Sequence, residues 1–470
     1  MDVESPLAAV QLRRAGLFQL LHGLASGRTT ATALAEISLD TVARLDPLLH
    51  AFVDVRPELV REQTEAAERR RREGVLGRLD GIPVAVKDNF DIAGWPTRAG
   101  LPGRGGHAAA HDAHVVARLR AAGAVILGKT ALDEGALGTV TANPHFGATH
   151  NPHRIGYTAG GSSGGSAVAV ATGMVAAALG SDTLGSVRIP ASYCGVCALK
   201  PTHGEISARG LVPAARRLDC VGLLAREVGD LSMLLQVLAG HDADDPRSRR
   251  RRVALALPDW EPGRLRTGVL ADPAAAGIEA PMQVVFDAAL ARLEHELGER
   301  QRVDFSDWPY ARMRRAGLLL MEAEMLHTYA ADLAADAAHP ASPAFRAMLD
   351  YARGKSAADY VAADRMLDAA KLKARRLFAQ VDVLVLPTTP QGAFALDAPV
   401  PDSQADLTAF ASLAGCPAVS IPMGLLPDGL PAGLQFVGPP GSDLRLLELA
   451  GVCAAALDGA PAYPVEPVLP

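Results

Sequence analysis

The sequence has few aromatic residues, few cysteines and no excess of positive charge, and each shortage argues against a class of protein. Of its 470 residues, 4% are aromatic and five are cysteines. A small, odd number of cysteines predicts no disulfide framework. The net charge of -6 argues against a general nucleic-acid-binding protein.

Long hydrophobic runs and a secretion signal are also missing. The apolar runs are short or interrupted by glycine, so none predicts an uninterrupted membrane span. The N-terminal residues MDVESPLAAVQLRRAG lack the order of charge, apolar run and small cleavage site that a signal peptide has. We therefore expect a cytoplasmic protein. Because 49% of the residues are hydrophobic and few of these are aromatic, we expect a large core of alanine, valine and leucine.

One cysteine pair has the spacing of a metal-binding or redox motif. Cys194 and Cys197 form a C-x-x-C inside an apolar run. No second pair stands at the spacing of a zinc site. We interpret both as buried structural cysteines and expect no metal and no cofactor.

Two runs of four arginines are the local exceptions to the acidic balance. Arg69–Arg72 belongs to a glutamate-rich stretch that predicts a helix, and Arg249–Arg252 follows Asp242, Asp244 and Asp245 in a predicted loop. We interpret both runs as solvated surface rather than as a nucleic-acid site.

The order of predicted elements indicates an α/β fold. Apolar spacing predicts helices across residues 6–72, and a short β-branched run predicts a buried strand, 82–86, that ends at Lys87. A glycine- and proline-rich loop, a helix (111–123) and a strand (124–129) follow, and residues 139–156 are expected to be loop. Further helices are predicted over 227–240, 281–298, 308–338 and 355–379, and further strands over 265–272 and in VDVLVLP, PAVSIP and AGLQFVG.

Strands and helices interleave from end to end, and no linker is long enough to force a division. This pattern predicts one domain over 1–470, with a mixed twisted β-sheet covered by helices on both faces. Within it we distinguish an N-terminal helical segment (1–80), a core that carries the chemistry (81–240), and the remaining sheet and pocket elements (241–470).

Two short motifs suggest chemistry but lack its structural context. The residues GAVILGKT, 123–130, satisfy the P-loop expression, but AVIL predicts the strand itself and leaves no loop for phosphate. The residues GGSSG, 160–164, satisfy the nucleophile-elbow expression, but loop rather than strand precedes them. Nucleotide binding and a Ser-His-Asp hydrolase are therefore minor alternatives.

The stretch 157–202 holds two clusters of glycine and serine separated by an apolar segment. Glycine is used where the backbone turns at positive φ or approaches another group closely. Serine beside such turns presents a hydroxyl next to backbone N–H groups. The two clusters therefore predict a site built from amides and hydroxyls, which needs a base from elsewhere in the chain.

Several longer motifs together resemble the amidase signature family of hydrolases. They are GIPVAVKDNFDIAG, AAGAVILGKT, AGGSSGGSA, GSDTLGSVRIPASYCGVCALKPT and the C-terminal GLPAGLQFVG. They occur in the family's order and cover most of the chain. The separation of Ser162 from Ser186 also matches the family.

The resemblance implies a Ser-Ser-Lys triad with Ser186 as nucleophile, Ser162 as the bridging serine and Lys87 as base. It also implies a cis peptide bond before the bridging serine and an acyl-enzyme intermediate. A lysine can act as a base near neutral pH only if burial lowers its pKa. Since a nearby carboxylate would raise that pKa, we expect Asp88 to point away from Lys87.

The same resemblance assigns an oxyanion hole to the backbone N–H groups of Thr183, Leu184, Gly185 and Ser186. Ser163, Asp182 and Arg188 are expected to support the site, the last two through an ion pair or hydrogen bonds rather than by touching substrate. Leu184 stands where most family members have glycine, and we expect its side chain to shape the acyl pocket. Other residues of that pocket are expected in loops near Trp308–Met325 and Gln391–Phe410.

The resemblance leaves open what the enzyme acts on and with whom. It implies hydrolysis of a carbon–nitrogen bond in a small-molecule amide, releasing ammonia or an amine. The alternative is the glutaminase (A) subunit of a tRNA-dependent amidotransferase, which would act with partner subunits. A third possibility is a binding protein without catalytic activity. The presence of all three triad residues argues against it. Homodimer formation is left open, and we expect no direct contact with nucleic acid or membrane.

Overall fold

The computed structural model describes residues 6–250, 264–334, 336–457 and 465–467. The strands are β1 (Phe52–Val55), β2 (Pro83–Lys87), β3 (Val125–Thr130), β4 (Ala142–Asn143), β5 (Gly147–Ala148), β6 (His150–Asn151), β7 (Arg154–Thr158), β8 (Ala177–Asp182), β9 (Cys197–Lys200), β10 (Cys220–Ala225), β11 (Arg266–Leu270), β12 (Glu299–Val303), β13 (Val383–Pro387), β14 (Ala418–Leu425) and β15 (Pro431–Val437).

The α-helices alternate with these strands along most of the chain. They are α1 (Pro6–Arg14), α2 (Leu17–Ala25), α3 (Ala31–Leu49), α4 (Pro57–Glu73), α5 (His114–Ala121), α6 (Gly164–Ala171), α7 (Arg188–Cys194), α8 (Val228–Leu238), α9 (Ala280–Arg292), α10 (Glu294–Leu297), α11 (Tyr310–Thr328), α12 (Pro343–Arg353), α13 (Ala357–Gln380), α14 (Asp406–Ala414) and α15 (Asp443–Leu457). Short 3-10 helices lie at η1 (Pro102–Gly106), η2 (Glu134–Ala136) and η3 (Asp402–Ala405).

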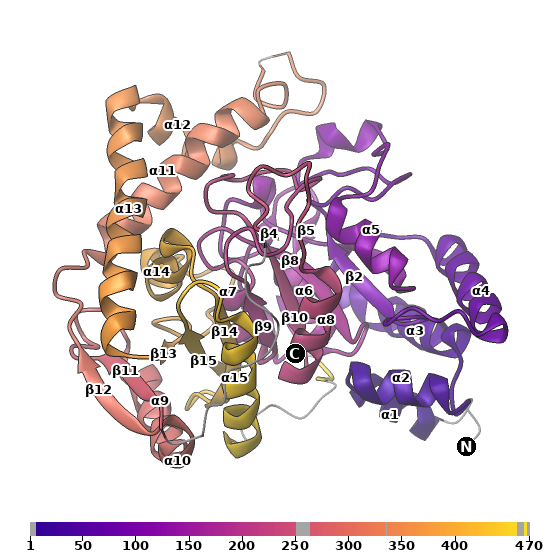
Figure 1. The fold of residues 1–470 in the computed structure, drawn as a ribbon. Coiled ribbons are helices and arrows are strands. Elements are labelled where there is room, and N and C mark those ends of the chain that lie inside the picture. The colour runs from indigo at the N-terminus through magenta and orange to yellow at the C-terminus, as the bar shows by residue number, and fades with distance from the viewer. Residues whose placement is uncertain (1–5, 251–263, 335, 458–464, 468–470) are drawn as a thin grey trace.

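One mixed sheet of 11 strands organises the described part of the chain, as predicted. Its order is β1-β3-β2-β8-β10-β9-β14-β15-β13-β11-β12. Near one edge β2 pairs in parallel with β3 and β8, and near the other β11 pairs in parallel with β12 and β13. The strands between these groups pair antiparallel. Figure 1 shows the N-terminal helices at one side of the sheet and α11–α13 at the other.

Helices cover both faces of the sheet, and strand residues alternate between the two cores. In β8, Ala177 and Leu179 belong to a core with residues of α8 and α15, whereas Ala178 belongs to a core with residues of α6 and α7. This alternation follows from the two-residue period of a strand. Because β8 is apolar on both sides, it is a buried central strand, and its end at Asp182 is held firmly in place.

Two sequence expectations about local structure were wrong. Residues 6–72 include the strand β1 between α3 and α4, and residues 139–156, expected as loop, contain β4–β6 and the start of β7. These strands are short, two to five residues each, so they are too brief for an alternating pattern to stand out. The segment GAVILGKT does contain β3, which confirms a strand where a P-loop would need a loop.

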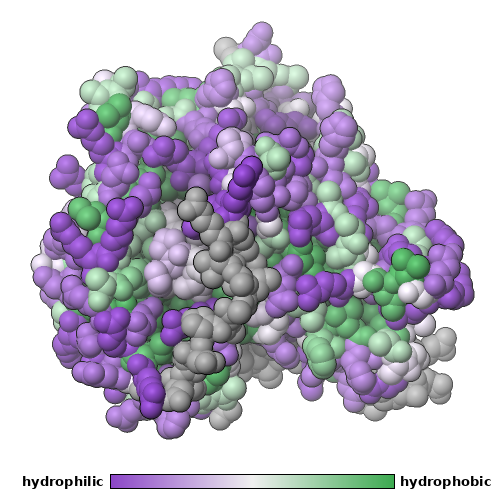
Figure 2. All heavy atoms as spheres, viewed as in Figure 1, coloured by the Kyte–Doolittle hydropathy of each residue, from purple (hydrophilic) through white to green (hydrophobic). Residues whose placement is uncertain are grey.

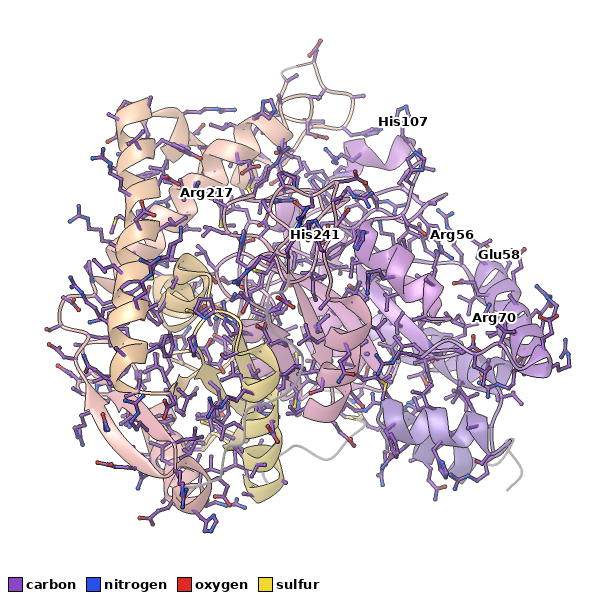
Figure 3. All side chains as sticks on the ribbon, in the orientation of Figure 1. Arg56, Glu58, Arg70, His107, Arg217 and His241 are labelled. Atoms are coloured by element: carbon purple, nitrogen blue, oxygen red, sulfur yellow. The ribbon has the colours of Figure 1, made fainter. Side chains whose placement is uncertain are left out.

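The arginine runs are only partly solvated surface. Arg70, labelled on α4 in Figure 3, donates to the buried Asp80 over 2.7 Å, and Arg71 lies 3.8 Å from the same carboxylate. The second run is described only as far as residue 250. Arg249 and Arg250 are exposed there, as expected, and the rest of that run lies outside the described residues.

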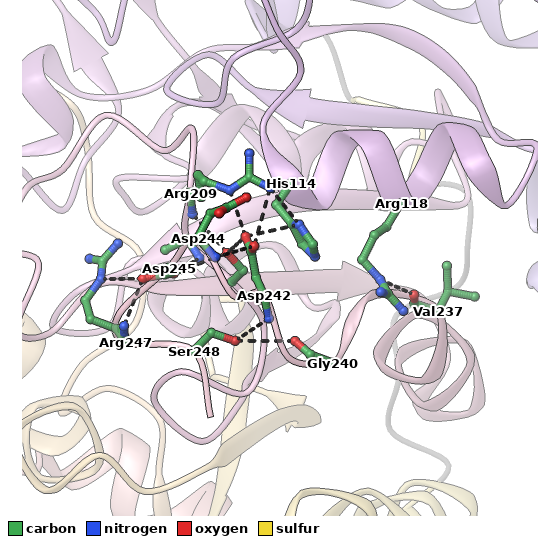
Figure 4. A network of polar contacts seen from close by, with 12 residues as sticks. His114, Arg118, Arg209, Val237, Gly240, Asp242, Asp244, Asp245, Arg247 and Ser248 are labelled. Atoms are coloured by element: carbon green, nitrogen blue, oxygen red, sulfur yellow. Dashed lines mark hydrogen bonds and ion pairs between the residues drawn. The ribbon is translucent and has the colours of Figure 1, made fainter. Parts of the chain in front are cut away.

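Two of the three acidic residues before the second run, Asp242 and Asp245, are buried and hold the loop against neighbouring segments. Asp242 accepts from Arg209 over 2.8 Å and lies 3.1 Å from Nδ1 of His114. Asp245 accepts from Arg247 over 3.1 Å (Figure 4). Asp244 is exposed. The acidic residues therefore fold this loop onto α5 and the segment after β9.

The face in Figure 2 is mostly hydrophilic, with separate small apolar patches. Exposed large apolar side chains are spread over many elements, singly or in adjacent pairs such as Val75 with Leu76, and Phe18 of α2 is the most exposed at 71%. Scattered residues of this kind are normal on protein surfaces. None of the described helices is both long enough and apolar enough to cross a bilayer.

Candidate active site

Lys87 ends the buried strand β2, and its side chain is fully buried. Its Nζ lies 2.7 Å from Oγ of Ser162 and 2.9 Å from Oγ of Ser181. Burial lowers the pKa of Lys87 to about 7, although the negative charges of nearby aspartates, Asp133 first among them, oppose the shift. At that pKa a large fraction of the lysine is neutral near pH 7 and can accept a proton.

Asp88 turns away from Lys87, which confirms the expectation. Its Oδ1 lies 2.7 Å from Nζ of Lys129 on the adjacent strand β3, and both side chains are buried. The charge of Asp88 is balanced by Lys129, so Asp88 does not serve as the counter-ion of Lys87. Lys87, the last residue of β2, and Asp88, the first residue of the turn after it, therefore direct their side chains to different partners.

Ser181 and Asn89 orient the amine of Lys87, and sequence reasoning did not find either of them. The Oγ of Ser181 receives hydrogen bonds from Nζ of Lys87 and from Nδ2 of Asn89, each over 2.9 Å. A neutral amine has two hydrogens and one lone pair. With one hydrogen directed at Ser181, the lone pair is free to face the hydroxyl of Ser162. The sequence signal that could have identified Ser181 is its position directly before Asp182, at the end of β8.

The two glycine–serine clusters lie against each other. The peptide bond between Gly161 and Ser162 is cis, as the family resemblance implied. The backbone N–H of Ser163 donates to the carbonyl of Ser186 over 3.0 Å, and its hydroxyl donates to the carbonyl of Ser181 over 3.2 Å. Ser163 therefore joins the loop of Ser162 to the loop of Ser186, in agreement with a supporting role.

Ser186 is the most accessible of the three predicted triad residues. It is 7% exposed, against 1% for Ser162 and 0% for Lys87. Solvent exposure therefore increases from Lys87 through Ser162 to Ser186. A substrate that enters from solvent would therefore meet the Ser186 hydroxyl before the other two groups.

The turn before Ser186 presents backbone N–H groups. Within the described residues, no acceptor meets the N–H of Leu184, Gly185 or Ser186. Gly185 has φ of +141°, and a Cβ there would lie 2.3 Å from Oγ1 of Thr408, so only glycine fits this turn. Thr408 in turn donates to the carbonyl of Leu184 over 2.5 Å. Thr183 donates through its hydroxyl to Asp219 over 2.7 Å.

Asp182 and Arg188 form the predicted ion pair on either side of this turn. Two guanidinium nitrogens of Arg188 each lie 2.9 Å from a different oxygen of Asp182, and neither side chain is exposed. The remaining donors of Arg188 reach the carbonyl of Thr408 and the side chains of Ser412 and Gln435. The C-terminal half of the chain thus holds the turn in place.

Breaking this pair should destabilise the protein strongly. In Arg188→Met, Asp182 is left buried without its cation, and we expect the free energy of unfolding to fall by about 3–5 kcal/mol. Urea unfolding followed by circular dichroism measures the change. Arg61→Met, which removes an exposed ion pair with Glu36, is the control and should change stability little. Equal losses in the two variants would contradict the role given to the buried pair.

Leu184 is 5% exposed and packs onto α11. A Cβ added to Gly317 would come within 2.8 Å of its side chain, so the leucine fills space that a small residue on α11 leaves open. The same core contains Phe305, Trp308 and Phe410, whose ring centroids lie 5.2–6.3 Å apart.

The segments expected as pocket loops are mostly helical. Residues 310–325 belong to α11, and residues 402–410 belong to η3 and the start of α14. The first segment lies within the helix predicted over 308–338, which is confirmed, whereas η3 and α14 were not predicted and residues 391–401 are loop.

No metal or cofactor is needed to account for this arrangement. Among the described residues, no group of three or more His, Cys, Asp or Glu side chains converges as a metal site. Cys194 and Cys197 are free and buried, as predicted, and burial raises the pKa of both thiols. Asp133, which the sequence analysis did not select, is buried near Gly161 and is the carboxylate with the largest influence on Lys87.

The sequence model of a family described as Amidase matches residues 33–447. The A subunit of glutamyl-tRNA(Gln) amidotransferase from Anaeromyxobacter dehalogenans (strain 2CP-C) is 38% identical, in a match that covers 97% of this chain and 99% of that protein. AtzE, a subunit of 1-carboxybiuret hydrolase from Pseudomonas sp. (strain ADP), is 37% identical over 92% and 97% of the two chains. The structure of a peptide amidase from Stenotrophomonas maltophilia superposes with a TM-score of 0.83 at 29% identity, over 97% and 98% of the two chains.

Proposed function

The chain belongs to the amidase family and is an amide hydrolase, and from this premise we propose that Lys87, Ser162 and Ser186 cleave the carbon–nitrogen bond of a small-molecule amide. The observation that carries the proposal is the 2.7 Å contact between the buried amine of Lys87 and the hydroxyl of Ser162. The join between the loops of Ser162 and Ser186 brings the proposed nucleophile to the same site.

The first step forms an acyl-enzyme. A serine hydroxyl is a weak nucleophile until a base takes its proton. Ser186 attacks the amide carbonyl, its proton passes to Ser162, and the proton of Ser162 passes to the neutral amine of Lys87. The tetrahedral intermediate then expels the amine, which takes its proton back along the same path. Lys87 is neutral again when the C–N bond has broken.

Water completes the cycle. A water molecule gives its proton along the same relay and attacks the acyl carbon, which releases a carboxylic acid and restores the Ser186 hydroxyl. The N–H groups of Thr183, Leu184, Gly185 and Ser186 would stabilise the negative oxygen in both steps. Each such donor contributes on the order of 3 kcal/mol to the transition state.

A panel of small amides, ureas and amino-acid amides tests this function. We expect the purified chain to release ammonia or an amine from at least one class, measured by a coupled ammonia assay or by chromatography of the products. The panel includes acyl groups of different apolar size, because the Leu184 side chain is expected to shape the acyl pocket. Absence of turnover on every class, by a folded protein with every partner subunit present, would refute the proposal.

The pH dependence should follow the titration of Lys87. Protonated Lys87 cannot accept a proton, so kcat/KM should rise about tenfold per pH unit below pH 7 and level off above it. The direction follows from the lowered pKa, because the active, neutral form gains population as pH rises. A profile from pH 5 to pH 9 on an uncharged amide measures it. A profile that is flat down to pH 5 would contradict Lys87 as the base.

A second candidate is the glutaminase component of an amidotransferase. The similarity to the A subunit of glutamyl-tRNA(Gln) amidotransferase, at 38% identity over nearly the full length, favours it. The relative AtzE is also named as a subunit. Under this reading the same triad releases ammonia from glutamine, and partner subunits govern the activity.

The two candidates differ in whether the chain acts alone. An amidase that acts alone turns over a small amide as a purified single chain and does not favour glutamine. A glutaminase subunit copurifies with partners from its native source and hydrolyses glutamine faster with them than without. Affinity purification under mild conditions, followed by an ammonia assay of the complex and of the isolated chain, distinguishes them.

A further inference from the structure

A cavity of about 340 Å³ lies outside the triad and is lined by basic side chains. Its nitrogen-bearing residues are His203, Arg216, Arg217, Arg247 and Lys371. They come from three places in the chain: the segment between β9 and β10, the loop after α8, and α13. None of the described residues that line the cavity is acidic. The volume is at the lower end of the range for small-molecule sites.

The cations retain donors for a ligand although each has a carboxylate partner. Arg216 contacts Glu324 over 3.1 Å, and Arg217, labelled in Figure 3, contacts Asp364 of α13 over 3.0 Å. These carboxylates stand outside the lining. A guanidinium has five N–H donors, and each of these ion pairs engages only part of that set.

Arg247 is fixed more firmly than the other two arginines. Its Nε donates to the buried Asp245 (Figure 4), and its Nη1 donates to the carbonyl of Arg216 over 3.2 Å. The least exposed of the three arginines is therefore already oriented before any ligand arrives. Such preorganisation lowers the entropic cost of binding.

His203 adds a polar atom without a partner. Its Nε2 is buried and meets no hydrogen-bonding group among the described residues. Burial lowers the pKa of His203 to about 4, and the positive charges of Lys200, Arg247 and Lys371 act in the same direction, while a hydrogen bond to the Arg216 backbone opposes them. An anion in the cavity would offset those positive charges and favour protonation of the ring.

The apolar part of the lining limits the kind of anion. Leu367 and Leu413 form part of the wall, and Ser412 adds a hydroxyl. An inorganic anion has no carbon atoms that could pack against the two leucine side chains. From the cavity, its five nitrogen-bearing side chains and this apolar wall, we infer that the cavity binds a small organic anion with at least two carboxylate or phosphate groups.

Isothermal titration calorimetry with citrate tests the site, with sulfate as the minimal probe and sodium chloride at matched ionic strength as the background. We expect saturable binding of citrate, weaker binding of sulfate and none of chloride.

Matched variants locate the site. Arg217→Gln and Lys371→Gln should each weaken citrate binding about tenfold, since each removes a charge-assisted hydrogen bond. Arg61→Gln should leave it unchanged. Arg61 and Arg217 are both about half exposed, at 54% and 52% of the side chain, and each makes one ion pair, so they differ chiefly in the cavity. Melting without anion checks that each variant folds.

Three results would overturn the inference. They are equal responses to citrate and chloride, equal losses in Arg61→Gln and Arg217→Gln, and binding of sulfate without binding of citrate. Binding is measured without turnover, so this test stands or falls separately from the proposed hydrolysis. An effect of citrate on kcat, through Ser412 and its contact with Arg188, would be a second readout and does rest on the proposed function.

Discussion

Replacing Ser186 by alanine should abolish amide hydrolysis, with kcat lower by on the order of 10⁶-fold, because the variant has no hydroxyl to form the acyl-enzyme. The turn itself should keep its shape. Gly185 sets its conformation, and the ion pair of Asp182 with Arg188 holds both ends. Single-turnover assays on the best amide of the panel measure the loss.

A buried serine on the neighbouring helix provides the control. Ser192 lies on α7 and is 1% exposed. It contacts Thr389 over 3.4 Å rather than the triad, and Ser192→Ala should keep kcat within about tenfold of wild type. Mass spectrometry after a quench should find the acyl group on the peptide that contains Ser186. Turnover that survives in Ser186→Ala would remove Ser186 as the nucleophile.

Replacing Lys87 by methionine should lower kcat by at least about 10⁴-fold, since neither serine then has a base. Methionine has nearly the length of lysine and no charge, so it fills the same buried space without leaving an unpaired ion. We expect the melting temperature of Lys87→Met to equal or exceed that of the wild type. If Lys87→Met lost its fold together with its activity, the loss of activity would not support Lys87 as the base. Activity within tenfold of wild type in the folded variant would refute that role.

Ser181→Ala separates positioning from catalysis. The variant keeps the base and both triad serines but frees the amine of Lys87 from one of its two hydrogen bonds. We expect a smaller loss than in Lys87→Met, together with a shifted midpoint in the pH profile. A loss as large as that of Lys87→Met with an unshifted midpoint would contradict a positioning role.

Site residues could be predicted from the sequence where they lie inside long sequence motifs. Lys87, Ser162 and Ser186 stand inside long motifs, and the structure brings Lys87 against Ser162 and joins the two serine loops. The ion pair of Asp182 with Arg188 and the turning away of Asp88 were also predicted and are present. The strands β2 and β13, of five residues each, were recognised because they are continuous apolar runs rich in valine and leucine.

The residues that sequence reasoning missed act across large separations in the chain. Thr408 reaches the carbonyl of Leu184, 224 residues away, and Gln435 reaches Arg188 across 247 residues. A local pattern contains no information about such contacts, because they depend on how α14 and β15 pack onto α7. Short strands such as β4–β6 and the central strand β8 escaped for a related reason, since pairing partners rather than periodicity define them.

The way Arg188 is held has a consequence for protein synthesis. When residue 400 has been synthesised, Lys87, Ser162 and Ser186 are already part of the growing chain. Three of the acceptors of Arg188, however, belong to residues 408, 412 and 435, which are still to be made. Until those residues emerge and pack, the buried cation has only Asp182 as its partner and the turn before Ser186 lacks its brace. The turn before Ser186 therefore gains this support only after residue 435 has been made, and a chain cut before residue 408 contains Lys87, Ser162 and Ser186 without it.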